Sequence, residues 1–227
     1  MQRALAMSII QVYSDITNAE NSKQLLFFVD EPETCLHPLA QDKLIEAFEK
    51  ISQNSQVFIT THSPYLFKKY NSSNHYIKIF SSIGNKVTQG STLNLFPFSP
   101  TWGEINYFAF GVCSIEFHNE LFGYLQEKFN KAQLDKMLKV DISEKKLRKE
   151  INRLTNENAF DEYLVKKGCI QNIKYIRTKN DGENCEQMKT LPMFIRNIIH
   201  HPENTHNKYS HEQLAQSIQK MIDIINN

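Results

Sequence analysis

Two stretches decide the fold of the first half of the chain: residues 25–38, LLFFVDEPETCLHP, and residues 56–64, QVFITTHSP. Each begins with an unbroken apolar run of strand length and ends in polar residues, acids in the first and a histidine in the second. Such runs are typical of buried parallel strands. Residues 39–51 between them place apolar side chains at helical spacing. The sequence therefore predicts a strand, helix, strand unit.

The acidic pair Asp30 and Glu31, at the end of the first predicted strand, has a specific use in nucleotide hydrolysis. The first carboxylate holds magnesium, usually through water, and the second accepts a proton from the attacking water. The carboxyl ends of parallel strands meet where α/β sheets bind their ligands. His62 follows the next strand, where an imidazole can reach a γ-phosphate and sense its presence. These residues are candidate site residues.

The segment around them resembles the Walker B, D-loop and switch-histidine run of ABC-type and AAA ATPases. It resembles the branch with RecF, SMC proteins, OLD nucleases and AbiEii-type defence ATPases. It covers about residues 1–65, and residues 2–5 resemble the end of the helix that follows the ABC signature. The resemblance implies an ATPase with ATP and Mg²⁺ as cofactors. It makes Asp30 the magnesium carboxylate, Glu31 the catalytic base and His62 the switch residue.

The same resemblance assigns Glu33, His37 and Pro38 to the D-loop, which lies across a dimer interface, and implies cofactor contacts for Glu33 and His37. The Walker A loop is missing, because no glycine precedes Gly84 and no GK[ST] occurs anywhere. Without backbone amides that wrap the phosphates, we expect the isolated chain to hydrolyse ATP weakly or not at all. We expect a truncated chain or a split subunit, acting as a homodimer or with a chain that carries Walker A.

The pattern becomes mostly helical after about residue 100. We therefore expect two domains: residues 1–100, the C-terminal half of an ABC-type ATPase core, and residues 101–227, an α-helical domain. Residues 75–95 favour a β-hairpin in the first domain. Helical spacing marks the expected helices, at residues 105–129, 141–154, 159–167, 191–201 and 213–225. The predicted fold class is α/β, a partial P-loop NTPase sheet followed by an α-helical domain.

A second candidate site lies in residues 191–204, LPMFIRNIIHHPEN. An arginine that holds a phosphate and a histidine that moves a proton suffice for metal-free RNA cleavage by the 2′-hydroxyl. Arg196, Asn197 and His201 resemble the HEPN ribonuclease motif, and nucleases of the PrrC and RloC type join an ABC-like ATPase to such a helical domain. The resemblance implies an RNA substrate such as tRNA. The alternative is a helix end with a favourable cation near its carboxyl dipole.

The charge balance, the cysteines and the apolar segments of the sequence limit the classes of function that we expect. Lys and Arg total 26 against 25 Asp and Glu, so no global charge field points to nucleic acid or membrane. Four scattered cysteines and the lack of a membrane-length apolar span predict a cytoplasmic protein without a membrane partner. Three functions stay open: an ATP-hydrolysing protein of anti-phage defence or a toxin system, a HEPN-like ribonuclease with the ATPase segment as scaffold, and a non-catalytic partner-binding fragment.

Overall fold

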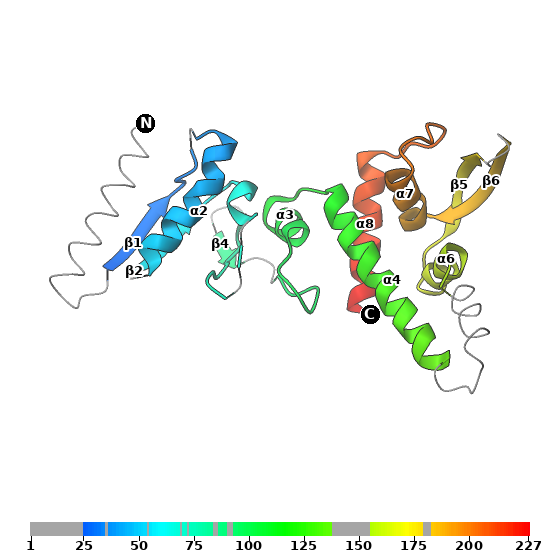
Figure 1. Ribbon diagram of the computed structural model, residues 1–227, viewed down its shortest axis with the longest axis horizontal. Helices are drawn as coiled ribbons and strands as arrows, with labels where there is room; N and C mark the ends of the chain where they lie inside the picture. Colours follow the sequence, from blue (N-terminus) through cyan, green and yellow to red (C-terminus); the bar gives the residue numbers. More distant parts are fainter. Residues whose placement is uncertain are drawn as a thin grey trace. The chain divides into compact units, whose positions relative to one another are not determined.

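The computed structural model describes residues 25–34, 36–53, 55–68, 70–71, 73–83, 86–89, 93–137, 155–178 and 183–227. Contacts divide the chain into two compact units, Met1–Thr92 and Leu93–Asn227 (Figure 1). The ATPase-like residues 2–5 and the helix expected at residues 141–154 lie outside the described residues. None of the described helices is both long and apolar enough to cross a membrane.

The first unit is built on a small parallel sheet. β1 (Leu25–Asp30) and β2 (Ser55–Thr60) pair side by side, and α2 (Pro38–Ser52) connects them. The register places Asp30 opposite Thr60, so both strands end at the same edge. The strand, helix, strand unit predicted from the sequence is thereby confirmed.

One face of this sheet packs against α2, and the opposite face is exposed. Successive side chains of a strand point to opposite faces, so Phe27 and Val57 pack against the core under α2 while Phe28 and Phe58 do not. Phe28 is 76% exposed, and its ring stacks on Phe58 with centroids 4.8 Å apart. The unbroken apolar runs indicated strands buried on both faces. That expectation is wrong for the described residues, because α2 covers one face only.

The remainder of the first unit consists of short elements. η1 (Pro64–Phe67) follows β2, and β3 (Phe80–Ile83) pairs antiparallel with β4 (Lys86–Gln89). This pairing confirms the hairpin predicted within residues 75–95. Residues 84–85, between the two strands, lie outside the described residues.

The second unit is mainly helical. Its elements are α3 (Trp102–Phe110), α4 (Ile115–Met137), α6 (Glu157–Lys166), β5 (Gln171–Thr178), β6 (Asn184–Thr190), α7 (Leu191–His200) and α8 (His211–Asn226). α8 and α7 pack beside α4, and the β5/β6 hairpin contacts α7 (Figure 1). α4, α6, α7 and α8 each contribute to one apolar core, whose fully buried members include Phe117, Leu121, Phe160, Ile195 and Ile218.

Capping residues set the helix ends in this unit. The side chain of Thr101 and that of Glu104 form a capping box at α3, and Ser210 and Gln213 form another at α8. The sequence predicted one helix over residues 105–129, which is wrong. Gly111 adopts a left-handed conformation with φ 68° and ends α3, and α4 begins a few residues later.

The β5/β6 hairpin was not predicted. Its strands pair antiparallel, from Gln171 opposite Thr190 to Thr178 opposite Asn184. Both strands are rich in polar residues, so their alternation of apolar and polar side chains is weak and does not predict strands between the helices expected at residues 159–167 and 191–201. The predicted fold class is nevertheless confirmed: a small parallel α/β sheet precedes a mainly helical part.

Candidate functional site

The shared edge of β1 and β2 carries the first candidate site. Asp30 and Thr60 are the paired last residues of the two strands. The hydroxyl of Thr60 donates a hydrogen bond to Oδ1 of Asp30, so the neighbouring strand fixes the orientation of the carboxylate. Because Asp30 is exposed, this carboxylate faces solvent at the end of the sheet.

Glu31 leaves β1 in a left-handed backbone conformation. Its φ is 41°, in a region that costs a residue other than glycine on the order of 1 kcal/mol. The N–H of Glu31 donates to the carbonyl oxygen of Thr60 at 3.0 Å. Its carboxylate accepts a hydrogen bond from the hydroxyl of Thr34 at 3.3 Å. The turn is therefore stabilised by one backbone hydrogen bond and one side-chain hydrogen bond of Glu31.

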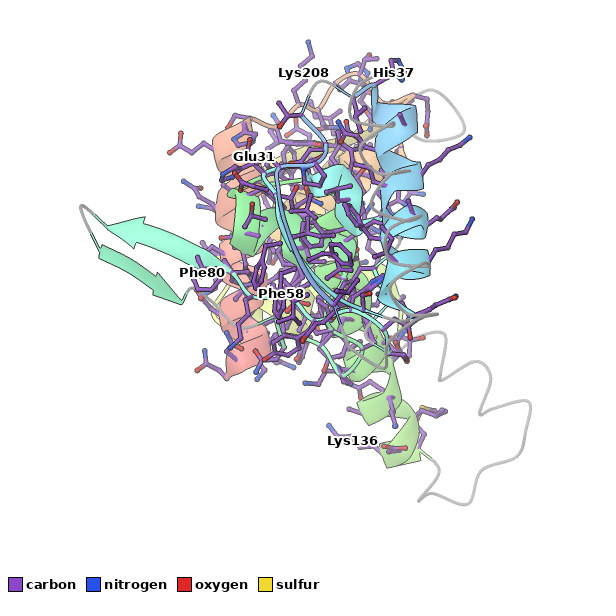
Figure 2. The ribbon with its side chains drawn as sticks, turned by 90° about the vertical axis from the view of Figure 1, so that its left-hand side faces the viewer. Glu31, His37, Phe58, Phe80, Lys136 and Lys208 are labelled. Atoms are coloured by element: carbon purple, nitrogen blue, oxygen red, sulfur yellow. The ribbon has the colours of Figure 1, made fainter. Side chains whose placement is uncertain are left out.

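The structure brings Glu31 and His62 together. Nε2 of His62 lies 3.5 Å from Oε1 of Glu31, and the two side chains are 88% and 45% exposed. Figure 2 shows Glu31 beyond the end of the strand and His37 beside the start of α2. Asp30, Glu31 and His62 thus lie at one edge of the sheet, open to solvent.

Glu33 holds the loop that carries the histidine. It is only 7% exposed, and its Oε1 accepts hydrogen bonds from the hydroxyl of Thr61 at 2.6 Å and from the backbone N–H of His62 at 3.1 Å. The hydroxyl of Thr61 in turn accepts a hydrogen bond from the N–H of Ser63 at 3.0 Å. The turn after β1 and the loop after β2 are therefore joined by a buried carboxylate.

α2 closes this group of hydrogen bonds. The hydroxyl of Ser63 donates to Oε1 of Gln41 at 2.6 Å, and Nε2 of Gln41 donates to the carbonyl oxygen of Leu36 at 3.2 Å. His37 precedes α2, where its carbonyl oxygen accepts the N–H of Gln41 at 3.2 Å and its side chain is exposed. Sequence reasoning missed Gln41, because a polar residue in the first turn of a helix has many uses.

The oxygen atoms at this edge suit a hard cation such as Mg²⁺. Magnesium is commonly held by one or two carboxylates together with waters and substrate phosphates, not by an all-protein cage. The carboxylates of Asp30 and Glu31 and the hydroxyl of Thr60 are oxygen donors of this kind. Within the described ranges no group of three or more His, Cys, Asp and Glu residues could hold a metal. The site fits a magnesium ion whose coordination is completed by a nucleotide and water.

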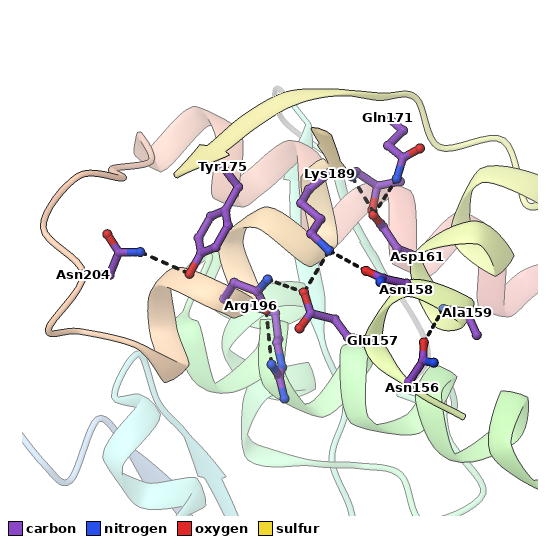
Figure 3. A network of polar contacts seen from close by, with 12 residues as sticks. Asn156, Glu157, Asn158, Ala159, Asp161, Gln171, Tyr175, Lys189, Arg196 and Asn204 are labelled. Atoms are coloured by element: carbon purple, nitrogen blue, oxygen red, sulfur yellow. Dashed lines mark hydrogen bonds and ion pairs between the residues drawn. The ribbon is translucent and has the colours of Figure 1, made fainter. Parts of the chain in front are cut away.

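The second candidate site lies on α7 (Figure 3). Arg196 is half-buried, with its guanidinium 5.8 Å from the ring centroid of Phe122. Nη1 of Arg196 donates to Oδ1 of Asn197 at 3.1 Å. In the described part of the chain no carboxylate forms an ion pair with Arg196. The positive charge of Arg196 is therefore available to an anion.

His201 lies just past the end of α7. Its backbone N–H donates to the carbonyl oxygen of Asn197 at 3.0 Å, and its Nδ1 lies 3.1 Å from Oε1 of Glu203. The structure thus joins Arg196 to Asn197, whereas the imidazole of His201 contacts Glu203. Burial, followed by the charges of Arg196 and His201, lowers the pKa of the neighbouring His200.

A buried lysine supports this site, and sequence reasoning missed it. Lys189 in β6 is 2% exposed, and its Nζ lies 3.0 Å from Oε1 of Glu157 and 3.1 Å from Oδ1 of Asn158. Burial raises the pKa of Glu157, but hydrogen bonds from Asn197 and Lys189 and the charges of Lys189 and Arg196 outweigh it and hold the pKa below its usual value. No sequence pattern marks Lys189 as buried, because lysines are almost always exposed.

Comparisons with known proteins bear on the first site. The AAA ATPase domain family matches residues 1–67. The Old nuclease of Escherichia phage P2 is 36% identical over 77 residues, which are 32% of this chain and 13% of that protein. The chain therefore spans a small part of that relative's length. Together with the pairing of β1 and β2, these matches identify residues 1–67 as part of an AAA ATPase core of the OLD-like kind.

Proposed function

We propose that the chain supplies the acidic pair and the switch histidine of a site that hydrolyses ATP, with Mg²⁺ as its cofactor. The observation that carries the proposal is the approach of His62 to 3.5 Å from Glu31 at the edge where β1 and β2 end. The left-handed backbone of Glu31 supports it, because such strain is retained mainly at functional sites. The AAA ATPase match supports the same chemistry.

Each residue has a distinct task in this proposal. Asp30, oriented by Thr60, holds magnesium through water. Glu31 accepts the proton of the water that attacks the γ-phosphate. His62, whose backbone is held by Glu33, contacts the γ-phosphate and reports its presence. Bound Mg²⁺ offsets the negative charge of the phosphate oxygens.

The phosphates need a second structural element. Backbone N–H groups of a Walker A loop wrap the phosphates in P-loop enzymes, and this sequence contains no GK[ST] run. We therefore place the nucleotide between this edge of the sheet and a Walker A loop from another chain or another segment. In a dimer, the D-loop lies at the interface with the exposed side chain of His37, whereas the buried carboxylate of Glu33 holds the loop from within the unit.

ATP turnover by a Glu31→Gln variant tests the assignment. The protein is produced together with the segment or partner that carries Walker A. Glutamine keeps the shape of the side chain but cannot accept the proton, so turnover falls about a hundredfold or more. Binding of Mg²⁺–ATP is retained. The matched control is Glu46→Gln, at an exposed glutamate of α2, which keeps full turnover. Unchanged turnover in Glu31→Gln would remove the catalytic role of this residue.

We also propose RNA cleavage as a function of the second unit, with Arg196, Asn197 and His201 as its site residues. The observation that favours it is that Arg196 is oriented by Asn197 yet forms no direct ion pair in the described part of the chain. The guanidinium holds the phosphate of an RNA such as tRNA. Nε2 of His201 takes the proton of the 2′-hydroxyl, the 2′-oxygen bonds to the phosphorus, and the 5′-oxygen leaves and takes a proton from solvent. In a defence or toxin system, the ATPase unit then controls or scaffolds this nuclease.

The double change Arg196→Ala with His201→Ala tests this second function. RNA cleavage is lost in the variant, because both the phosphate contact and the proton acceptor are removed. Matched controls are Arg177→Ala and His206→Ala, at an exposed arginine and an exposed histidine of the same unit. Cleavage that survives the double change would refute the nuclease assignment. A protein with neither ATP turnover nor RNA cleavage would instead fit a non-catalytic, partner-binding role.

A further inference from the structure

We propose that Glu157 is the positioning residue of the second site, and that it acts through the side-chain amide of Asn197 to present Arg196 to a phosphodiester. This inference rests on the proposed nuclease function of the second unit. Figure 3 shows the network that carries it, with Lys189 and Glu157 beside Arg196. The network starts at a buried ammonium group and ends at a half-buried guanidinium.

Asn197 joins two groups of opposite hydrogen-bonding character. Its Nδ2 donates to Oε1 of Glu157 at 2.6 Å, and its Oδ1 accepts from Nη1 of Arg196 at 3.1 Å. An ionised carboxylate only accepts and a guanidinium only donates, so this amide orientation satisfies both groups and the flipped one satisfies neither. Asn197 is 3% exposed, so water is not at hand to replace a lost partner. The position of Glu157 therefore determines that of Arg196.

Lys189 anchors the carboxylate of Glu157. A buried ammonium requires a close, hydrogen-bonded counter-charge. Nζ of Lys189 lies 3.0 Å from Oε1 of Glu157, the same oxygen that accepts the hydrogen bond of Asn197. Both donors converge on one atom, so the buried charge holds the carboxylate at one place.

The charges of this network leave one positive charge in excess. The carboxylate of Glu157 lies against Lys189 and also feels the charge of Arg196, whereas Asn197 and the ring of Phe122 carry no charge. A guanidinium has five N–H donors, and Asn197 takes one of them. A phosphodiester offers one negative charge and paired oxygens, which match the fork of an arginine. A phosphodiester is therefore an anion that suits this arrangement, and on the proposed nuclease function it is that of an RNA backbone.

The test distinguishes the effect of the hydrogen bond between Asn197 and Glu157 from the effect of the buried ion pair between Glu157 and Lys189. Two double variants of the full chain both remove the ion pair: Glu157→Gln with Lys189→Met, and Glu157→Leu with Lys189→Met. The first keeps an oxygen that can accept from Asn197, and the second does not. Replacement of both members of a buried ion pair by neutral residues is commonly tolerated, and thermal unfolding checks that both variants fold. The control is Lys174→Met with Glu186→Gln, which removes an exposed ion pair of the same hairpin.

The readout is the side-chain NMR signal of Arg196 during a titration with inorganic phosphate. The wild type, the control and the glutamine variant should bind phosphate at Arg196 alike. The leucine variant should bind about tenfold more weakly, because the amide of Asn197 has lost its acceptor. Equal binding by the two double variants, or no response of Arg196 in the wild type, would overturn the proposal. A wild type that gives the expected phosphate results but does not cleave RNA would refute the nuclease function and still support the positioning role.

Discussion

Acid should destabilise the second unit through His118. This residue is fully buried, its Nε2 lies 3.0 Å from the hydroxyl oxygen of Ser217, and its Nδ1 has no hydrogen-bond partner among the described residues. Burial lowers the pKa of His118 from 6.5 to about 4. A neutral imidazole fits this site, whereas an imidazolium would place a charge and a second N–H without an acceptor in the core.

The size of the effect follows from the two pKa values. In the unfolded chain His118 takes up its proton near pH 6.5, but in the folded chain only near about pH 4. Between these values the unfolded state binds more protons, so the free energy of unfolding falls as the pH falls. The contribution is fully present above pH 6.5. At about 1.4 kcal/mol for each pKa unit, the loss across the window is about 3 kcal/mol.

Urea unfolding at a series of pH values measures this loss. The comparison is with His118→Gln, which cannot be protonated in this range and keeps a polar group near Ser217. We expect the wild type to lose about 3 kcal/mol more than His118→Gln across the window. An exposed histidine variant, His206→Gln, should follow the wild type. Parallel profiles of the wild type and His118→Gln, or an NMR titration of His118 centred near 6.5, would refute the reasoning.

Substitutions at three further positions test local features of the fold. Glu31→Gly should be about 1 kcal/mol more stable than Glu31→Ala in thermal unfolding, because glycine adopts φ 41° without strain, and equal stabilities would contradict this. Glu33→Leu should accelerate hydrogen exchange of the His62 amide, which loses its acceptor, while Glu33→Gln should not. Gly103→Ala should lower the free energy of unfolding by about 1–3 kcal/mol. Its added carbon would lie 2.8 Å from the Cα of Phe117, and an unchanged melting temperature would exclude that clash.

The strand, helix, strand unit was predictable because its signals are local. Apolar runs of strand length and an amphipathic helix between them can be read directly from residues 25–60. The exposure of Phe28 and Phe58 was not predictable, because an unbroken apolar run does not say which faces are covered. In the second unit, the end of α3 at Gly111 was not predictable either. A glycine within a helical pattern is often tolerated, and here its left-handed conformation ends α3.

The two candidate sites differ in how much of their geometry could be predicted from the sequence. The approach of Glu31 to His62 follows from the rule that parallel strands end at one edge. The role of Glu33 does not, because its partners, Thr61 and the N–H of His62, follow the next strand. No sequence pattern predicts the role of Lys189. Its burial depends on the hairpin that places it against Glu157, and that hairpin was missed.

The contacts that support each candidate site also indicate what else that site needs for its proposed function. Within the described residues, contacts between residues 30 and 63 orient Glu31 and His62, so much of the geometry of the first site is encoded locally. Yet those two side chains are 45% and 88% exposed, and hydrolysis of a phosphoanhydride requires groups that bind the phosphates and exclude bulk water. The second site differs in this respect. Its support is a buried ionic network within one unit, so Arg196 is oriented before any ligand arrives. On the proposed functions, the first site therefore requires a further surface for activity, whereas anion binding at Arg196 does not.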